Sequence, residues 1–175
     1  FDVACTSGQY VSLGVGQRGI DVVARLLDSD GKVIVEYDYD PRIVGDEEVE
    51  FVSDQTGNCR LAVEPRQRAA RQGNFVITWK GSRVSTEKDK ALYESRLLMA
   101  QATRLWRSSK YTEALPPADK ALAIRERELG PEHPDVGWAV FTLANIYSDL
   151  PDLKKAETNY LRAIEIRSKV LGADH

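Results

Sequence analysis

The sequence has few of the residues that metal sites and covalent catalysis commonly use. It holds two histidines, two cysteines and one methionine among 175 residues. Cys5 and Cys59 are too few for a disulfide framework and lack the spacing of a zinc site. No partner residue recurs beside both His133 and His175, so neither indicates a catalytic base or a metal ligand. The sequence therefore predicts no catalytic residue, no metal site and no cofactor.

Long apolar runs and an excess of positive charge are also missing. No apolar run reaches the roughly 20 residues of a membrane-spanning helix, so no membrane span is expected. The formal net charge is −3, whereas a general nucleic-acid binder needs a positive excess to neutralise phosphates. No signal peptide begins at Phe1. The first residues already alternate as in a strand, and we expect the natural start to precede them.

Residues 1–82 alternate between apolar and polar side chains with a period of two. The segments are rich in β-branched and aromatic residues and are separated by turn residues. Seven strands are predicted, at 1–5, 10–17, 21–28, 32–39, 48–53, 59–63 and 74–80. Because no helical segment lies between them, we expect antiparallel pairing in a two-sheet β-sandwich.

The inward phase of two of these strands bears on the core. Cys59, Leu61 and Val63 should point inward, and along 74–80 we expect the aromatic phase that includes Trp79 to be buried. With Trp79 buried, no exposed aromatic row indicates a carbohydrate-binding surface. Both cysteines lie on an apolar phase, which leaves two interpretations open. They are buried free thiols, which we favour, or they form a mutual disulfide.

The charged loops in this half can be interpreted as ligand-binding sites or as ordinary solvent-exposed loops. The acidic turns lack the later ligands of a calcium-binding EF-hand loop, and three arginines on one hairpin could hold an anion. We interpret both sets as turn formers and solvated loop charges. The residues concerned are Asp28, Asp30, Asp38, Asp40, Asp46, Glu47, Glu48, Arg66, Arg68 and Arg71.

The order of motifs in residues 1–82 resembles a known family. The stretches are "GQYVSLGVGQRGIDVVARLLDSDGKVIVEYD", "TGNCRLAVEP" and "GNFVITW". Together they resemble the bacterial pre-peptidase C-terminal type of β-sandwich, with Cys59 at a position where that family usually has tyrosine. The resemblance implies a non-catalytic accessory domain, often found on exported proteins.

The period changes from two to that of a helix after residues 83–86, which we expect to be a linker. Thr86 offers a hydroxyl cap, and Glu87 and Asp89 are acids suited to a first helical turn. Helices are predicted at 87–108, 111–129, 136–150 and 153–171. The sequence thus divides into a β-sandwich at 1–82 and a helical part at 87–175.

The helical part repeats itself with a fixed offset. The stretch "LGPEHPD" at 129–135 returns as "LGADH" at 171–175, so that His175 follows His133 by 42 residues. The same offset relates Arg125 to Arg167, Ala121 to Ala163 and Ala114 to Ala156. A fixed period with matching small and large residues indicates an α-solenoid of about two helical hairpins. We expect the natural chain to continue the array beyond His175.

The spacing of small and aromatic residues resembles that of tetratricopeptide repeats. Ala144, Tyr147, Ala156, Tyr160 and Ala163 carry this spacing. The 42-residue unit and the stretch "ALAIRERELGPEHPDV" resemble the kinesin-light-chain type. Thr142 departs from that type, which commonly has asparagine there. A short β-sandwich before such repeats resembles the front part of bacterial tetratricopeptide proteins that often end in a caspase-like CHAT peptidase domain.

These resemblances imply a non-enzymatic interaction and scaffold module whose first helices line a concave face. Helical phase predicts the positions exposed there. They are Arg96, Met99, Thr103, Trp106 and Arg107 in the first unit, and Trp138, Phe141, Thr142, Asn145 and Ser148 in the second. Asn145 is suited to a peptide backbone, and Arg96 and Arg107 to an acidic group. Alternatively, Met99, Trp138 and Phe141 cover the next repeat.

Two further interpretations concern context. The chain could be the regulatory or substrate-recruiting arm of a larger CHAT-type peptidase whose catalytic domain lies outside it. The sandwich's resemblance points to a bacterial extracytoplasmic location, with the cytoplasm as the other option. Finally, the last helix should expose apolar side chains and favour self-association. The side chains concerned are Tyr160, Leu161, Ile164 and Leu171.

Overall fold

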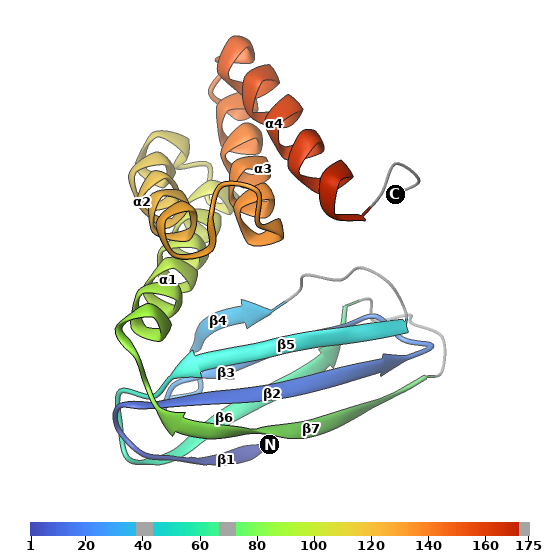
Figure 1. Cartoon of the computed structure of the whole chain (residues 1–175), viewed down its shortest axis with the longest axis vertical. Helices are drawn as coiled ribbons and strands as arrows, with labels where there is room; N and C mark the ends of the chain where they lie inside the picture. Colours follow the sequence, from blue (N-terminus) through green and yellow to red (C-terminus); the bar gives the residue numbers. More distant parts are fainter. Residues whose placement is uncertain (38–43, 67–72, 172–175) are drawn as a thin grey trace. The chain divides into compact units, whose positions relative to one another are not determined.

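The computed structural model describes residues 1–37, 44–66 and 73–171. Within these residues, seven strands precede four helices (Figure 1). The strands are β1 (Asp2–Cys5), β2 (Gln9–Arg18), β3 (Val22–Leu27), β4 (Val33–Tyr37), β5 (Val44–Val52), β6 (Gly57–Pro65) and β7 (Asn74–Val84). The helices are α1 (Glu87–Arg107), α2 (Tyr111–Leu129), α3 (Pro134–Asp149) and α4 (Leu153–Leu171). The predicted order of strands and then helices is confirmed.

The strands form two antiparallel sheets, as the alternating pattern predicts. One sheet has the order β1-β6-β3-β4 and the other the order β5-β2-β7. Inward-facing side chains of both sheets make the core, because alternate residues of each strand point to one face. The buried core includes Val11, Leu13, Val15, Val22, Ala24, Leu26, Val35, Tyr37, Val49, Phe51 and Leu61.

The inward phase of β7 agrees with the sequence, but the burial of Trp79 does not. Ile77 lies opposite the buried Val15, and Trp79 lies opposite the buried Leu13. Residues directly opposite in an antiparallel pair share one face. Trp79 is nevertheless 52% exposed, so the expectation that it is buried is wrong. β7 is an edge strand of its sheet, and burial of its inward face depends on what the other sheet places opposite.

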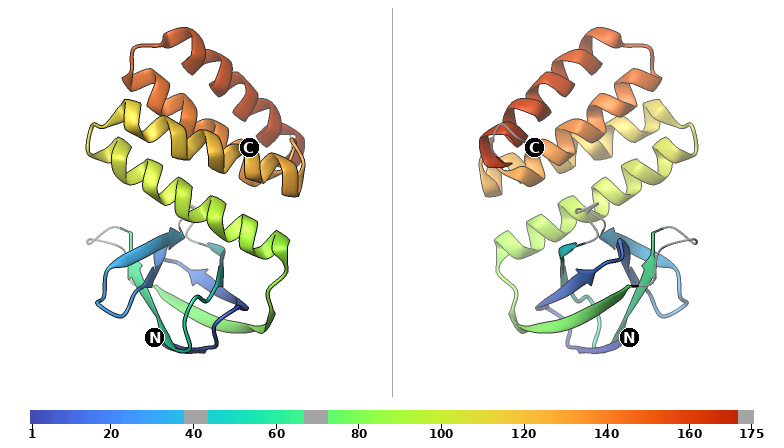
Figure 2. Two further views of the ribbon diagram at one scale, coloured as in Figure 1. Left: turned by 90° about the vertical axis from the view of Figure 1, so that its left-hand side faces the viewer. Right: turned by 90° about the vertical axis from the view of Figure 1, so that its right-hand side faces the viewer.

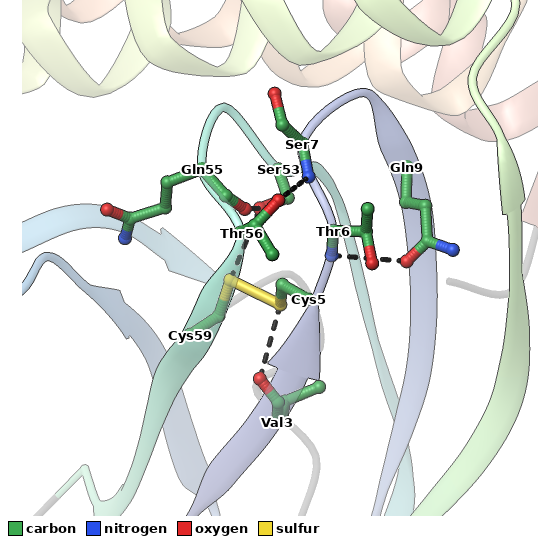
Figure 3. Close-up of a disulfide and its surroundings, with 9 residues drawn as sticks. All are labelled: Val3, Cys5, Thr6, Ser7, Gln9, Ser53, Gln55, Thr56 and Cys59. Carbon is green, nitrogen blue, oxygen red and sulfur yellow. Dashed lines mark hydrogen bonds between the residues drawn. A yellow bond between two sulfur atoms is a disulfide. The ribbon is translucent and has the colours of Figure 1, made fainter.

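The two cysteines form a disulfide, so the favoured interpretation of free thiols is wrong. Cys5 of β1 is bonded to Cys59 of β6, and the two Cα atoms are 6.0 Å apart (Figure 3). β1 and β6 are hydrogen-bonded neighbours. Beside the bond, the backbone N–H of Ser7 donates to Oγ1 of Thr56 over 3.1 Å. The bond and its neighbourhood thus fix β1 to the sheet at its carboxyl end.

The acidic positions of the sandwich differ in their roles. Oδ1 of Asp28 accepts hydrogen bonds from the backbone N–H groups of Asp30 and Lys32, as expected of a turn former. Glu47 is not a solvated loop charge as predicted: it lies in β5 on the inward phase and is buried. Asp38, Asp40, Arg68 and Arg71 lie outside the described residues. Among those that are described, no group of three or more His, Cys, Asp or Glu side chains could hold a metal ion.

The strand-to-helix transition carries the cap that the sequence predicts. The backbone N–H of Asp89 donates to Oγ1 of Thr86 over 3.2 Å, and the backbone N–H of Thr86 donates to Asp89 over 2.7 Å. This reciprocal pair is a capping box. β7 ends at Val84 and α1 begins at Glu87. The chain's two compact units, Phe1–Tyr93 and Glu94–His175, divide slightly later, within α1.

The helices lie in successive layers (Figure 2), and small residues lie at their contacts. Ala102 of α1, Ala114 and Ala118 of α2, and Leu143 and Ile146 of α3 form one buried cluster. Alanines at these contacts let helix axes approach closely. A second cluster joins α3 to α4 through apolar residues of both helices. Within the described residues, no helix is long and apolar enough to cross a membrane.

Candidate functional site

Phe141 and Asn145 belong to the part of the predicted concave face that α3 supplies. They lie one helical turn apart on α3, and both contact Tyr160 of α4. The Phe141 ring meets the Tyr160 ring edge-on, with centroids 5.8 Å apart, and stays 39% exposed. The Tyr160 hydroxyl donates to Oδ1 of Asn145 over 2.7 Å. Tyr160 therefore orients both side chains.

That hydrogen bond determines what Asn145 can offer to a ligand. With Oδ1 accepting from Tyr160, the side-chain amide nitrogen is the atom that remains. It has no hydrogen-bond partner within the part of the chain that the structure describes. The two N–H groups of an amide nitrogen held in this way are donors suited to a backbone carbonyl or a carboxylate.

Trp138 lies on the same side of α3 but is partly covered. Its ring packs against a cluster formed by Met99 of α1, Ala121 of α2 and Ala139 of α3. This contact corresponds to the alternative interpretation, in which such side chains cover a neighbouring helix. Trp138 therefore joins the helices and exposes only part of its surface.

Two predicted positions are not at the surface. Thr142 is 4% exposed, and its hydroxyl donates to the carbonyl of Trp138, one turn back in the same helix. Met99 is also buried, inside the cluster under Trp138. The expectation that these two side chains face solvent is wrong, because helical phase alone does not show how far a neighbouring helix covers the edge of a face.

The α1 side of the face is basic. Arg107 is exposed, and Arg96 and Thr103 are half-buried. The indole N–H of Trp106 donates to Oδ2 of Asp149 over 2.6 Å. That bond links the last turn of α1 to the last turn of α3. Ser148, also predicted here, is exposed.

Sequence reasoning missed the roles of Asp149 and Tyr160 at this face. The sequence pattern assigns no role to Asp149, and it marks Tyr160 as a repeat residue and as an exposed apolar side chain of the last helix, but not as a residue that orients this face. An indole N–H that packs between helices usually needs an acceptor. A carboxylate 43 residues after Trp106, about one repeat later, was a signal that could have identified Asp149.

His133 acts in the structure as a helix cap. The backbone N–H of Asp135 donates to its Nδ1 over 3.2 Å, and Pro134 follows at the first helical position of α3. Pro is favoured at that position because its missing N–H would be unpaired there anyway. Pro134 therefore opens α3, and His133 caps it. His175 lies outside the described residues.

Comparison with known proteins identifies the helical part. A family model described as tetratricopeptide repeat matches residues 93–169. The matched range spans most of α1 and all of α2 and α3, and it ends in α4. No curated protein matches the chain significantly. The helical hairpins are therefore of the tetratricopeptide type, a type that generally serves in binding proteins.

Proposed function

We propose that the chain is a non-enzymatic interaction module whose helical repeats bind a peptide or protein segment on the face of α1 and α3. The observation that carries the proposal is the pair Phe141 and Asn145. An exposed aromatic ring lies beside an oriented side-chain amide, on repeats of a type used for protein binding. Together they supply an apolar contact and a hydrogen-bond donor for an extended segment.

The chemistry of the face favours a segment with an acidic group. Arg96 and Arg107 lie on α1, and arginine forms two parallel hydrogen bonds with a carboxylate. A ligand would place a carboxylate near α1 and an apolar side chain against Phe141. Thr103 and part of Trp138 complete the surface, whereas the buried Thr142 is not part of it.

A peptide-display selection tests this proposal. The selected peptides should carry an acidic residue or a free carboxyl terminus, and Asn145→Ala and Arg107→Ala should each weaken their binding about tenfold. Asn159→Ala and Arg127→Ala are matched controls, because Asn159 bonds within its own helix and Arg127 pairs with its neighbour Glu128. Equal binding by all four variants would contradict the proposal.

We extend the proposal to the kinesin-light-chain type of repeat and to a bacterial protein with a pre-peptidase C-terminal-like sandwich. The 42-residue offset supports the first, and the seven-strand sandwich before the repeats is compatible with the second. The disulfide adds support for an oxidising compartment, where such bonds persist. Alkylation of thiols in intact cells should leave Cys5 and Cys59 unmodified in that case.

The second candidate function is a recruiting arm of a caspase-like CHAT peptidase. It is favoured by the order of the sandwich and the repeats. In that case, a caspase-like domain joined after the repeats would cleave a bound partner faster than an unbound one. Asn145→Ala would remove the difference, whereas a pure scaffold would show no difference to remove.

We also propose that α4 supports self-association. In the first repeat, Leu122 of α2 packs against α3, yet its counterpart Ile164 of α4 is 61% exposed. Leu153 and Leu161 of α4 are exposed too, and such patches favour association. The side chain of Leu171, also predicted here, is not described. Light scattering at rising concentration should show oligomers that Ile164→Lys removes and that Thr112→Lys, at an exposed position of α2, does not.

A further inference from the structure

The sandwich carries an apolar pocket that the proposed function does not use. It has a volume of about 670 Å³ and opens between β1 and β7. β1 is the last strand of one sheet and β7 the last strand of the other, and Figure 1 shows both on the same side of the sandwich. Phe1, Val3, Leu13, Phe75, Ile77 and Trp79 provide its apolar lining.

The pocket is covered at one end and open at the other. Phe1 reaches Phe75, with ring centroids 6.2 Å apart, but the inward face of β7 near Trp79 is left open. The half-exposed tryptophan is therefore the uncovered end of the sandwich core and not an isolated surface residue.

The two basic side chains of β7 turn over the sheet and not toward the pocket. Lysines on an edge strand commonly discourage pairing with another chain. Here Lys80 crosses β2 above Gly14 to reach Glu48 of β5, and a Cβ at Gly14 would lie only 3.0 Å from Lys80 Cε. Arg83 likewise turns over the sheet, where its guanidinium lies 4.3 Å from the Tyr10 ring centroid.

Both cations thus lie over the outer face of the sheet, away from the pocket. Tyr10 and Glu48 alternate with buried residues of β2 and β5, so they point outward, and Gly14, which has the same phase as Tyr10, is covered by Lys80. The pocket side of β7 carries only uncharged residues, Phe75, Ile77, Trp79 and Ser82. The acidic residue in the lining is Asp2, and its Oδ1 lies 3.7 Å from Nε of Arg60.

We propose that β7 and this pocket bind an extended, uncharged segment of a partner protein, which adds a strand to the β7 edge. Among the described strands, β7 has a neighbour on one side only, so its backbone offers donors and acceptors along the other side. The pocket beside it requires large apolar side chains. An added strand meets both requirements. Its backbone hydrogen-bonds to that of β7, and every second side chain, repeating at about 6.8 Å, turns toward the pocket.

Two other occupants satisfy only part of this arrangement. A second copy of the chain could pair its β7 with this one, but its own inward side chains would point into its own pocket and fill nothing here. A small apolar molecule would fit the volume, since ligand pockets commonly measure about 300–1,000 Å³. It would leave the β7 backbone unpaired.

Titration of the full, oxidised chain with synthetic peptides tests the proposal. The probes are capped heptapeptides with threonine at odd positions and leucine, valine, phenylalanine or tyrosine at even positions. At least one should shift the backbone amide resonances of β7 and the Trp79 indole resonance. Each peptide is also made in two N-methylated forms, one methylated at the odd amides and one at the even amides, which face opposite edges of a bound strand. One form should lose binding and the other should keep it.

Variants locate the site. Trp79→Glu places a charge in the pocket and should weaken binding about tenfold or more. Thr78→Glu is the matched control, because Thr78 is exposed on the opposite face of the same strand, and it should change affinity less than twofold. If Trp79→Glu does not fold, Ser82→Lys at the pocket rim replaces it, with the same expected loss.

Four results would overturn the proposal. They are no binding by any peptide of the set, equal weakening by the two glutamate variants, unchanged binding by both N-methylated forms, and dimerisation through β7 without peptide. Binding of the apolar dye anilinonaphthalene sulfonate alone would indicate a small-molecule pocket instead. None of these results bears on the helical face, where Asn145→Ala reports separately.

Discussion

Arg125 is an arginine buried inside the helical unit. It is 2% exposed, and its Nη1 donates to the carbonyl of Asp135 over 2.9 Å while its Nε donates to Oγ of Ser95 over 3.3 Å. One residue of α2 thereby contacts both α1 and α3. Burial of an arginine is costly unless its donors are used. Arg125 therefore stabilises the junction of α1, α2 and α3, because it donates to the Ser95 hydroxyl and the Asp135 carbonyl.

We predict that Arg125→Ala lowers the free energy of unfolding by about 2–4 kcal/mol, because it removes packing and leaves buried polar groups without partners. Arg167 is the counterpart one repeat later and is exposed. Arg167→Ala should therefore change stability by less than about 0.5 kcal/mol. Chemical denaturation followed by circular dichroism at 222 nm measures both. Equal losses would show that the buried contacts contribute nothing specific.

Single residues are where sequence reasoning was least complete. The offset of 42 residues paired Arg125 with Arg167, yet it could not show that one is buried and the other exposed. Burial depends on which helix comes next, and the same holds for Thr142 and Met99 at the edge of a face. Trp79 failed for the corresponding reason in the sandwich. Its inward phase followed from alternation, but the position of β7 at the edge of its sheet did not.

The first turn of α1 shows how a charge stabilises an element. The guanidinium of Arg83, together with hydrogen bonds from Thr86, holds the pKa of Asp89 well below its usual range. A carboxyl group with a lowered folded pKa stabilises the folded state above its unfolded pKa, which is near 3.9. That contribution is lost progressively as the pH falls below about 4 toward the folded pKa.

We therefore predict that Asp89→Asn costs about 1 kcal/mol at pH 7, as the loss of a helix cap does, and that this difference shrinks as the pH falls from 4 to 2. Thermal unfolding from pH 7 to pH 2 measures it. Glu87→Gln is the control, since Glu87 pairs with an exposed lysine in its own helix. A difference that stays constant with pH would rule out the proposed role of the carboxylate.

Helix α2 continues through two prolines. Pro116 is exposed and Pro117 is buried, and each removes a backbone N–H donor from the helix interior. One repeat later the same positions are Thr158 and Asn159, whose side chains donate to the carbonyls of Lys154 and Lys155. The helix forms despite its prolines because its apolar face is buried against α1 and α3.

Replacement of the exposed proline should stabilise the protein. We predict that Pro116→Ala raises the free energy of unfolding by about 1–3 kcal/mol, since proline is about 3 kcal/mol less favourable than alanine within a helix. Thr158→Pro, the reciprocal change in α4, should lower it by a similar amount. Differential scanning calorimetry would show opposite shifts of the transition. A loss of stability in Pro116→Ala would mean that the proline is needed for the path of α2.

At the level of elements, local patterns predicted most of the structure. The predicted helix at 111–129 has the bounds of α2, and that at 153–171 has the bounds of α4. Alternation placed the seven strands within a few residues, because half-buried strands show a period of two directly. The pairing order was not predictable, since β2 joins β7 and β1 joins β6 through contacts distant in the sequence.

At the scale of the whole chain, the single disulfide lies in the sandwich unit alone. It closes a loop between cysteines 54 residues apart, and such bonds typically contribute about 2–4 kcal/mol. We predict that reduction speeds hydrogen exchange in β1 and β6 and leaves α2, α3 and α4 unchanged. Mass spectrometry with and without a phosphine reductant measures this. The double variant Cys5→Ser and Cys59→Ser should not respond to reductant, and faster exchange in the helices would contradict the prediction.

The order of strand pairing affects how the chain folds as it is synthesised. β1 emerges well before its partner β6, and β2 emerges before both of its partners, β5 and β7. The sandwich therefore cannot close until about residue 84 has left the ribosome, and until then β1 and one edge of β2 lack their late partners. Each helical hairpin needs only the helix just completed. A nascent chain of this protein thus exposes apolar strand faces while the sandwich is being made, which is when chaperones would be most useful to it.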